Sequence, residues 1–476
     1  MSSDKLARNL VAGQRRRYPV GATGDLHALI GFASRDITPP AGTRWKLWGA
    51  SQAETAVGVH RPLTATAVAI NADGHQLVVV SLDVCEWPDA DDERAVRHGI
   101  AERCQLTTDQ VLLHSTHTHS GQAPCLRQVG LPGGEHLAEH LELIGEQAAT
   151  AAVTAIAEAR PAILTWDTGR STLAAYRDET RDGRAVVGRD PNIAADDTVL
   201  VGRVSDETGA VIGVLVSYAC HPTVLGWANQ LISPDYVGAL RELIAAHYAG
   251  APTVFLQGAS GELAPARQYR SGVADADRAG RALGHAVLAT LELMPAPDQR
   301  LVPTSIVESG APLGVWDEQP TPPDNHIRVR RLDLRLPRKT EPLALPADLP
   351  EHVRAEREAR AELVGRNAGD QPEVPYPVWL WELGALVLVA HPGEAYSWLA
   401  RTLRQALTPR PVLVANLTNG AGAFYLPPRE AYARPSYTVA QTPAGPGSLE
   451  LVAEAVLTAL GVTATSPSLQ PTIQES

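Results

Sequence analysis

The chain has 476 residues, of which 44% are hydrophobic and 20% are charged, and its formal net charge at pH 7 is −12. This length and composition are typical of a large globular domain with a substantial core. The acidic balance argues against nucleic acid or an anionic membrane as the main partner.

Neither the cysteines nor the ends of the chain indicate a secreted or membrane-spanning protein. The four cysteines form no CxxC pair, and a chain of this size does not depend on a disulfide framework. We therefore expect small buried thiols at Cys85, Cys104, Cys125 and Cys220. No apolar stretch accompanies Arg15-Arg16-Arg17, and none is long enough to span a membrane, so we expect a cytoplasmic protein without membrane insertion.

In chain order, a polar arm is expected over residues 1–28, and order is expected to begin at Ile30. The next two apolar runs flank Asn71-Ala72-Asp73-Gly74, which predicts a β-hairpin with a buried second strand. A proline-rich connector is expected over 310–324, and a polar loop over 177–197. The predicted strands are 62–70, 76–83, 110–113, 162–173, 211–218, 253–257, 327–336, 379–390 and 412–417. The predicted helices are 91–104, 136–159, 237–247, 274–293, 350–367 and 449–460, with one more beginning near 394.

Three histidines follow the apolar run 111–113 within six residues: His114, His117 and His119. If the strand pleat persists beyond the run, His117 and His119 face the same side. Histidine is the commonest metal ligand, and functional residues gather on loops. A metal or catalytic role is therefore favoured over a set of structural histidines.

Other predicted buried strands also end in a turn with a polar side chain. Because open α/β sheets bind ligands outside the carboxyl ends of their strands, this convergence predicts one mixed α/β domain with one site. Taken singly, these residues also have structural explanations, such as a helix N-terminal carboxylate or a packed tyrosine. The side chains that follow the strands are His117 and His119, His221, Glu262, Glu394 and Tyr425.

Four further residues are weaker candidates. Asp83 and Asp235 are acids that can line the site, although a helix cap explains Asp235 about equally well. His136 and His140 have the i, i+4 spacing of a metal pair. Neighbouring glutamates favour a solvated helix face for both histidines instead.

The order of the motifs resembles the neutral/alkaline non-lysosomal ceramidase family from about residue 30 to residue 460. No single motif is decisive, and the resemblance depends on their succession. The matching segments are Ile30–Thr38 with Gly49, Thr116-His117-Thr118-His119-Ser120-Gly121, Cys220-His221-Pro222-Thr223, Pro392-Gly393-Glu394, and Tyr425–Tyr432 with Tyr437.

The resemblance implies a mixed β-sheet flanked by helices, with one zinc ion. The implied ligands are His117, His221, Glu394 and Tyr425. His119 and Tyr437 would contact the substrate or the reacting carbonyl, and Arg177 would bind the substrate. Two histidines and one carboxylate agree independently with catalytic zinc sites. The predicted organisation is a flexible N-terminal arm (1–28), a single metallohydrolase domain (29–465) and a C-terminal tail (466–476).

The chain also departs from the family pattern. Where the family has a GDVSPN motif with a functional serine, this chain has Gly261-Glu262-Leu263-Ala264-Pro265-Ala266. Glu262 therefore replaces the aspartate and is expected to orient a zinc-bound histidine, whereas Ala264 replaces the serine. The family's C-terminal immunoglobulin-like domain is not expected in this chain. With 3 Phe and 2 Met, composition offers no obvious aromatic lipid groove.

The favoured function is zinc-dependent hydrolysis, in which metal-activated water attacks an amide bond of a soluble N-acyl compound. His119 is the best candidate to pass a proton to the leaving group. One alternative is a hydrolase of an ester, lactone or glycosidic bond on the same scaffold. Another is a catalytically inactive ligand-binding homologue. The expected partner is a small-molecule substrate, and the role of 310–375 is left open.

Overall fold

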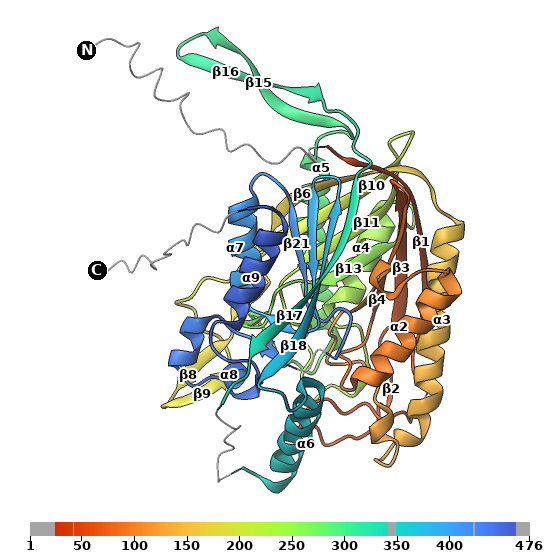
Figure 1. The fold of residues 1–476 in the computed structure, drawn as a ribbon, viewed down its shortest axis with the longest axis vertical. Helices are drawn as coiled ribbons and strands as arrows, with labels where there is room; N and C mark the ends of the chain where they lie inside the picture. Colours follow the sequence, from red (N-terminus) through yellow and green to blue (C-terminus); the bar gives the residue numbers. More distant parts are fainter. Residues whose placement is uncertain (1–23, 41, 341–348, 422–423, 463–476) are drawn as a thin grey trace, which may run out of the picture.

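The computed structural model describes residues 24–462 apart from 41, 341–348 and 422–423, and two β-sheets pack face to face within it (Figure 1). Most of the expected arm and the whole expected tail, 466–476, lie outside the described residues. The first strand, β1, begins at Leu26, within the span expected for the arm. Leu26 and Ala28 are buried and pair with Leu164 and Ala162, which explains the early start.

The larger sheet has eight strands in the order β13-β11-β10-β6-β1-β3-β4-β5. The pairs β4–β5 and β11–β13 are parallel and the other neighbours are antiparallel, so the predicted mixed sheet is confirmed. Its strands are β1 (Leu26–Asp36), β3 (Thr64–Ala72), β4 (His75–Leu82), β5 (Val111–Ser115), β6 (Arg160–Arg170), β10 (Thr198–Asp206), β11 (Val211–Tyr218) and β13 (Thr253–Gln257).

The smaller sheet has four strands in the order β17-β18-β19-β21. The single strand predicted at 379–390 is wrong, because the chain reverses at Gly384, which has a left-handed φ of 55°. Both halves of the resulting hairpin are buried, so the apolar run continues through the turn. The strands are β17 (Ile327–Pro337), β18 (Glu373–Leu383), β19 (Leu386–Ala390) and β21 (Val412–Ala415).

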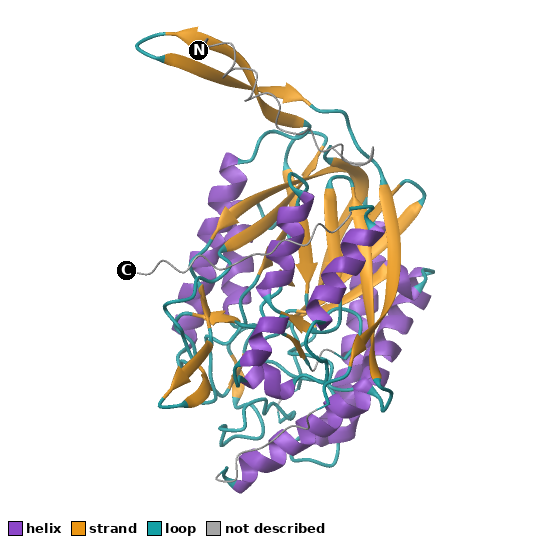
Figure 2. Ribbon diagram, turned by 60° about the vertical axis from the view of Figure 1, so that its left-hand side comes forward, coloured by secondary structure: helices purple, strands orange, loops and turns teal. Residues whose placement is uncertain are grey.

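Apolar side chains from both sheets form the central core, including Ile30 and Leu164 from the larger sheet and Trp381 and Leu388 from the smaller one. Helices cover the outer faces, as Figure 2 shows. The helices α2 (Ala90–Cys104) and α3 (Leu137–Ala157) cover one half of the larger sheet, α4 (Tyr236–His247) and α5 (Val273–Leu293) cover the other half, and α6 (Glu351–Ala368), α7 (Ser397–Leu407) and α9 (Ser448–Ala459) pack on the smaller sheet.

Three parallel strand–helix–strand units determine where the site forms: β4–α2–β5, β11–α4–β13 and β19–α7–β21. The turns that follow their strands carry the histidines and acids singled out in the sequence. Short bridges join these turns: β2 (Gly58–Val59) with β12 (Leu231–Ile232), β7 (Ala174–Tyr176) with β14 (Leu263–Pro265), and β20 (Glu394–Ala395) with β22 (Tyr425–Leu426).

Two segments expected to lack regular structure contain hairpins. The loop predicted at 177–197 includes β8 (Asp178–Arg181) and β9 (Arg184–Val187). The connector predicted at 310–324 is wrong, because β15 (Gln299–Glu308) pairs with β16 (Pro312–Pro320). Its two prolines occupy the ends of β16, where a missing N–H is tolerated. The β15–β16 hairpin projects from the body and exposes Ile306 (71%) and Trp316 (56%) (Figures 1 and 2).

The solvated face predicted for His140 is also wrong. His140 is buried, its Nε2 lies 2.8 Å from the carbonyl oxygen of Ile37, and its Nδ1 contacts Gln122. The neighbouring Glu139 and Glu142 are exposed, because they project from the opposite side of α3. His140 is thus a hydrogen-bonded core residue rather than half of a metal pair.

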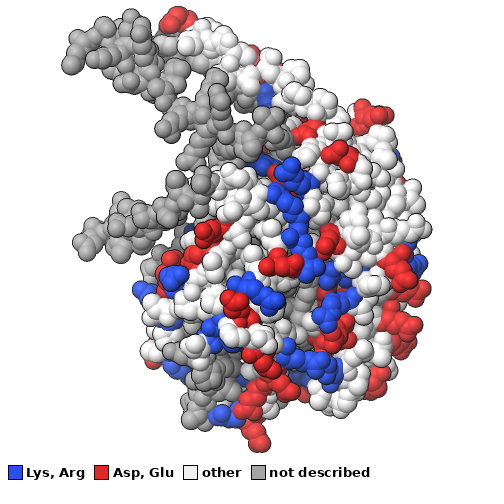
Figure 3. Space-filling model, viewed as in Figure 1, with Lys and Arg blue, Asp and Glu red and all other residues white. Residues whose placement is uncertain are grey.

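On the face shown in Figure 3, basic and acidic side chains are interspersed. Among residues 24–462, with the gaps given above, no helix has the length and apolar character that a membrane span requires. The short helix α8 (Tyr437–Gln441) completes the regular elements used below.

Candidate metal centre

His117, His221 and Glu394 meet where β5, β11 and β19 end. The Nε2 atom of His221 lies 2.8 Å from Glu394 Oε2, and the Nε2 atom of His117 lies 3.3 Å from the same oxygen. One ligand atom from each of the three lies within 4.8 Å of the other two, and all three side chains are buried. This group can hold a metal ion.

His117 reaches the group through a turn, and the expected strand pleat does not persist. β5 ends at Ser115, and His117 has a left-handed φ of 72°, an uncommon conformation for a residue with a side chain. Its N–H donates to the carbonyl of Val84 (3.0 Å), which holds the turn. The rings of His117 and His119 nevertheless lie together, with centroids 4.7 Å apart. Such local strain is typical of functional sites.

The surroundings of both imidazoles fit a metal. Nδ1 of His117 lies 2.7 Å from the carbonyl oxygen of Cys85, and Nδ1 of His221 lies 2.9 Å from that of Leu263. With Nδ1–H donating to a carbonyl, each Nε2 keeps a free lone pair directed at the centre. Glu394 Oε1 is buried and has no hydrogen-bond partner among the described residues. Two imidazole nitrogens and a carboxylate are a donor set that suits zinc.

The charges within the group are coupled: burial opposes protonation of His117, but Cys85 and Glu394 raise its pKa well above the usual value, so a metal ion would replace a proton there. Burial opposes ionisation of Glu394, but His117 and His221 together hold the pKa of its carboxyl well below the usual range. Burial first, and the nearby Arg177 guanidinium second, lower the pKa of His221 to about 3. His221 is therefore neutral at pH 7, the form in which imidazole binds a metal.

Tyr425 and Arg177 lie beside Glu394. Tyr425 stands opposite Glu394 in the parallel bridge between β20 and β22. Arg177 Nη2 donates to the Tyr425 hydroxyl (3.2 Å) and to the carbonyl of Gly261 (2.7 Å), and its guanidinium lies over the Tyr425 ring. Burial first, then Glu394, raises the pKa of Tyr425 well above its usual value, so the phenol is neutral.

His119 and Tyr437 flank the group on its more open side. His119 Nε2 lies 3.3 Å from His117 Nε2, and His119 is partly exposed. Tyr437 is the first residue of α8, and its ring centroid lies 5.7 Å from that of Tyr425. The structure thus places His119 against His117, and Tyr437 against Tyr425.

Three aromatic residues beside His119 were not singled out from the sequence. Trp48 lies 5.1 Å from His119 and 5.6 Å from Tyr269 between ring centroids, and Trp227 lies 5.5 Å from Tyr269. Trp227 is 43% exposed, so this aromatic wall reaches the surface. The low aromatic content of the whole chain concealed it, because composition does not show where the few aromatic residues gather.

The prediction that Glu262 orients a histidine is wrong. Its carboxylate accepts hydrogen bonds from the N–H of Ser397 (2.9 and 3.0 Å) and contacts the Ser397 hydroxyl, so it stabilises the N-terminus of α7. The main-chain carbonyl of the next residue, Leu263, orients His221 instead. The side chain of residue 262 therefore supports α7, and the main chain of residue 263 positions His221.

Three other candidates have structural roles. Asp83 is fully buried and accepts hydrogen bonds from both terminal nitrogens of Arg241 (2.6 and 2.9 Å). Asp235 caps α4 by accepting from the N–H of Tyr236 (2.7 Å). His114, the first histidine of the cluster, points away from the group, accepting at Nε2 from the N–H of Gln257 (2.8 Å). Cys85, Cys125 and Cys220 are buried free thiols, as predicted, and Cys104 is partly buried.

The buried histidines outside the metal group predict acid sensitivity. Burial lowers the pKa of His114 and of His391 to about 3, against about 6.5 in the unfolded chain. Below pH 6.5 the unfolded chain binds protons that the folded protein rejects, so stability falls as pH falls. Each histidine should remove about 2 kcal/mol between pH 8 and pH 5. Urea unfolding at both pH values should show this loss, and His114→Gln should lessen it by about 2 kcal/mol; an unchanged difference would refute the assignment.

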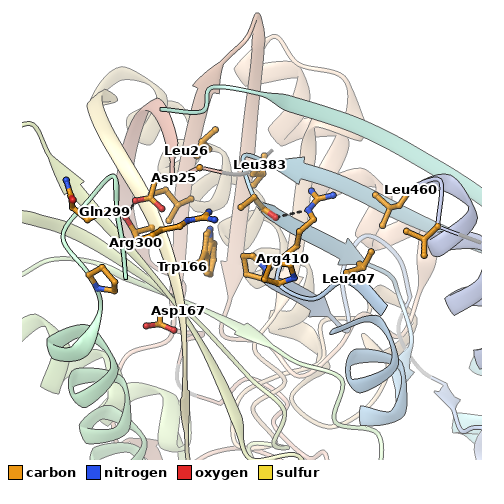
Figure 4. A pocket seen from close by; sticks show the side chains of 18 residues that line it. Asp25, Leu26, Trp166, Asp167, Gln299, Arg300, Leu383, Leu407, Arg410 and Leu460 are labelled. Carbon is orange, nitrogen blue, oxygen red and sulfur yellow. Dashed lines mark hydrogen bonds between the residues drawn. The ribbon is translucent and has the colours of Figure 1, made fainter. Parts of the chain in front are cut away.

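A separate pocket of about 350 Å³ lies where β19 and β21 begin, and thus at the opposite end of these strands from the metal group. Figure 4 shows Trp166, Leu383 and Arg410 among the residues that line it. It contains none of the residues of the metal group or its neighbours described above.

Comparison with known proteins shows which proteins this chain resembles. Residues 28–255 match the family model described as neutral/alkaline non-lysosomal ceramidase, N-terminal. The resemblance to the neutral ceramidases is confirmed. Neutral ceramidase B of Dictyostelium discoideum is 29% identical over 238 residues, which are 46% of this chain and 32% of the relative. The match thus spans about a third of that relative's length.

Solved structures show that the fold extends well beyond the matched segment. A ceramidase complexed with C2 superposes with a TM-score of 0.68 at 18% identity, over 94% of this chain and 77% of that chain. The neutral ceramidase from Pseudomonas aeruginosa gives a TM-score of 0.67 at 18% identity, with the same coverage. The neutral ceramidase fold therefore includes the smaller sheet, which supplies Glu394 and Tyr425.

Proposed function

We propose that the protein is a zinc-dependent hydrolase that cleaves the amide bond of a soluble N-acyl compound. The observation that carries the proposal is the buried group of His117, His221 and Glu394, in a fold shared with proteins named as ceramidases. We further propose a cytoplasmic enzyme in which residues 29–465 act as one domain with this site.

In this proposal one zinc ion is held by His117, His221 and Glu394, with Tyr425 as the fourth ligand. When bound, zinc supplies Lewis acidity that polarises a carbonyl and lowers the pKa of water to about 7. The partners of the ligands, namely the carbonyls of Cys85 and Leu263, fix the imidazole tautomers. Arg177 orients the Tyr425 hydroxyl.

We propose that His119 acts as the general base and then as the general acid of the reaction. Burial, followed by the nearby His117 and His221, lowers its pKa well below the usual value, so it is neutral at pH 7 and can accept a proton at Nε2. It can then pass this proton to the nitrogen of the departing amine as the C–N bond breaks. We propose that Tyr437 donates to the developing oxyanion, a contribution of about 3 kcal/mol for such a donor. The wall of Trp48, Trp227 and Tyr269 offers an apolar surface for the acyl group.

The alanine at position 264 supports an alternative to amide hydrolysis. Ala264, at the position of the family's functional serine, is buried in β14 and pairs with Ala175. Alanine offers no hydroxyl to the scissile group, so the polar contacts there differ from those of the family. An ester, lactone or glycosidic-bond hydrolase on this scaffold is the alternative, and substrate panels should include those bonds.

The test combines metal analysis with turnover. Purified protein should contain one zinc per chain by mass spectrometry of metals, and it should release amine from N-acyl substrates. A chelator should abolish this release, and added zinc, but not magnesium, should restore it. A chain that binds zinc but hydrolyses only esters, lactones or glycosides would establish the alternative. A chain that takes up no divalent metal would refute the proposal, and bound zinc without turnover of any panel member would indicate an inactive binding protein.

A further inference from the structure

The helix α6 lies next to two loops that contact the histidines of the metal group. It lies at the end of the sheets near β2 and α8 (Figure 1). Only Val364 and Ala368, toward its C-terminus, are buried in the core. One turn apart in its middle, Glu356 and Arg360 lie against loops on either side of the site. A Cβ atom at Gly49 would meet the Glu356 carboxylate, so the Glu356 side chain lies directly against the backbone at Gly49.

Both loops that α6 reaches also contact the histidines. Gly49 follows Trp48, whose ring packs on His119. Arg360 Nη2 lies 3.6 Å from Glu86 Oε1, and Glu86 follows Cys85, whose carbonyl orients His117. Arg360 therefore lies beside the loop that positions His117, within electrostatic reach of His119.

The guanidinium of Arg360 is poorly satisfied by the protein. Its Nε is buried and has no hydrogen-bond partner among the residues described, and the 3.6 Å separation from Glu86 is longer than a hydrogen bond. Arg177, on the other side of the group, likewise has a buried Nε without such a partner. Buried donors left unpaired are unfavourable, and the planar fork of arginine matches a carboxylate.

Electrostatics agree with this placement. Tyr437 acts most strongly to raise the pKa of Arg360 against the effect of burial, and Glu86, Tyr425 and Glu394 act in the same direction. Arg360 is therefore a permanent cation within electrostatic reach of the proposed catalytic residues. Arg177 is also charged, whereas Glu86 and Glu356 are acidic neighbours of Arg360, so a substrate carboxylate would have to offer the hydrogen bonds that Glu86 does not make.

We propose that Arg360 binds a carboxylate of the substrate, so that the compound cleaved is an N-acyl amino acid rather than a neutral amide. This inference rests on the proposed function. Water adds its hydroxyl to the acyl carbon and its proton to the nitrogen, the C–N bond breaks, and a fatty acid and a free amino acid leave. Arg360 is a specificity-determining residue in this reaction and takes no proton.

A matched substrate pair tests the inference. N-decanoylglycine and N-decanoylethanolamine share the acyl chain and the scissile amide, and differ in a carboxylate against a hydroxymethyl group. The wild type should favour the glycine compound at least about tenfold in kcat/KM. Arg360→Met should lower kcat/KM for that compound roughly 100-fold, chiefly through KM, and should change the ethanolamine compound less than about threefold. Arg360→Lys should restore part of the preference.

The control is Arg366→Met, which removes an arginine from the same helix that pairs instead with Asp91 (3.5 Å). It should leave both substrates unaffected. Equal losses on both substrates in Arg360→Met, or a wild-type preference for the neutral amide, would overturn the inference while the amidase function stands. If the wild type cleaves neither compound, calorimetry with the zinc-loaded chain decides: N-decanoylglycine binding that is lost in Arg360→Met but kept in Arg366→Met supports the carboxylate site, and equal or absent binding overturns it.

Discussion

His117→Ala is expected to lose the bound metal and all measurable hydrolysis, whereas His119→Ala, only two residues away, should keep the metal. The two side chains lie 3.3 Å apart at Nε2, but only His117 shares Glu394 with His221. In His119→Ala, turnover should fall roughly 10²- to 10⁴-fold, the usual contribution of a positioned acid–base group.

Metal content and turnover of both variants should be measured on the same preparations. His114→Gln serves as the control for losing a buried histidine, since His114 contacts Gln257 and Thr418 rather than the group. It should keep one metal per chain. Loss of metal from His119→Ala but not from His117→Ala would reverse the assigned roles, and retention in both would show that the ion binds elsewhere.

Arg241→Met is expected to destabilise the fold by about 3–5 kcal/mol, because it leaves the fully buried carboxylate of Asp83 without its counter-charge. The threonines Thr64 and Thr116 also donate to Asp83, but their hydroxyls carry no charge. Urea unfolding at pH 7 measures the loss.

The double variant Asp83→Asn with Arg241→Met should recover part of this loss, since an amide needs no counter-charge. Arg170→Met removes a surface pair with Asp197 and should have no measurable effect, because both side chains are solvated. A loss below about 1 kcal/mol in Arg241→Met would mean that Asp83 finds other partners, contrary to the ion pair observed.

Predictions from sequence succeeded where burial alone decides the pattern. Fully apolar runs such as Val211–Tyr218 became central strands, and the turns after them carry His221 and Glu394, as expected. Helices with clear periodicity also lie within a few residues of their predicted ends. That these turns meet at one site was expected because ligands bind beyond the carboxyl ends of strands, whereas the strand order was not predicted, because periodicity does not contain it.

The failures have identifiable causes. β16 was not predicted, because its prolines indicated a connector. They lie at the ends of the strand, where they do not interrupt it. The turn at Gly384 was not predicted, because the apolar run continues on both sides of it. The prediction of a solvated face for His140 is wrong, because exposed charged neighbours on a helix do not show whether the residue between them faces the core. Glu262 was given the role of its backbone neighbour, since a sequence does not reveal whether a side chain or a carbonyl faces a histidine.

The separation of the proposed ligands along the chain has a consequence for biosynthesis. His221 and Glu394 are 173 residues apart, and Tyr425 lies a further 31 residues along the chain. At about 5–20 residues per second, roughly ten to thirty seconds pass on the ribosome between His221 and Glu394. During that interval the nascent chain has two imidazoles but no carboxylate to complete the group. The proposed ion would therefore be held only after Glu394 has been synthesised, and the folded site rather than the emerging chain would determine which metal is kept.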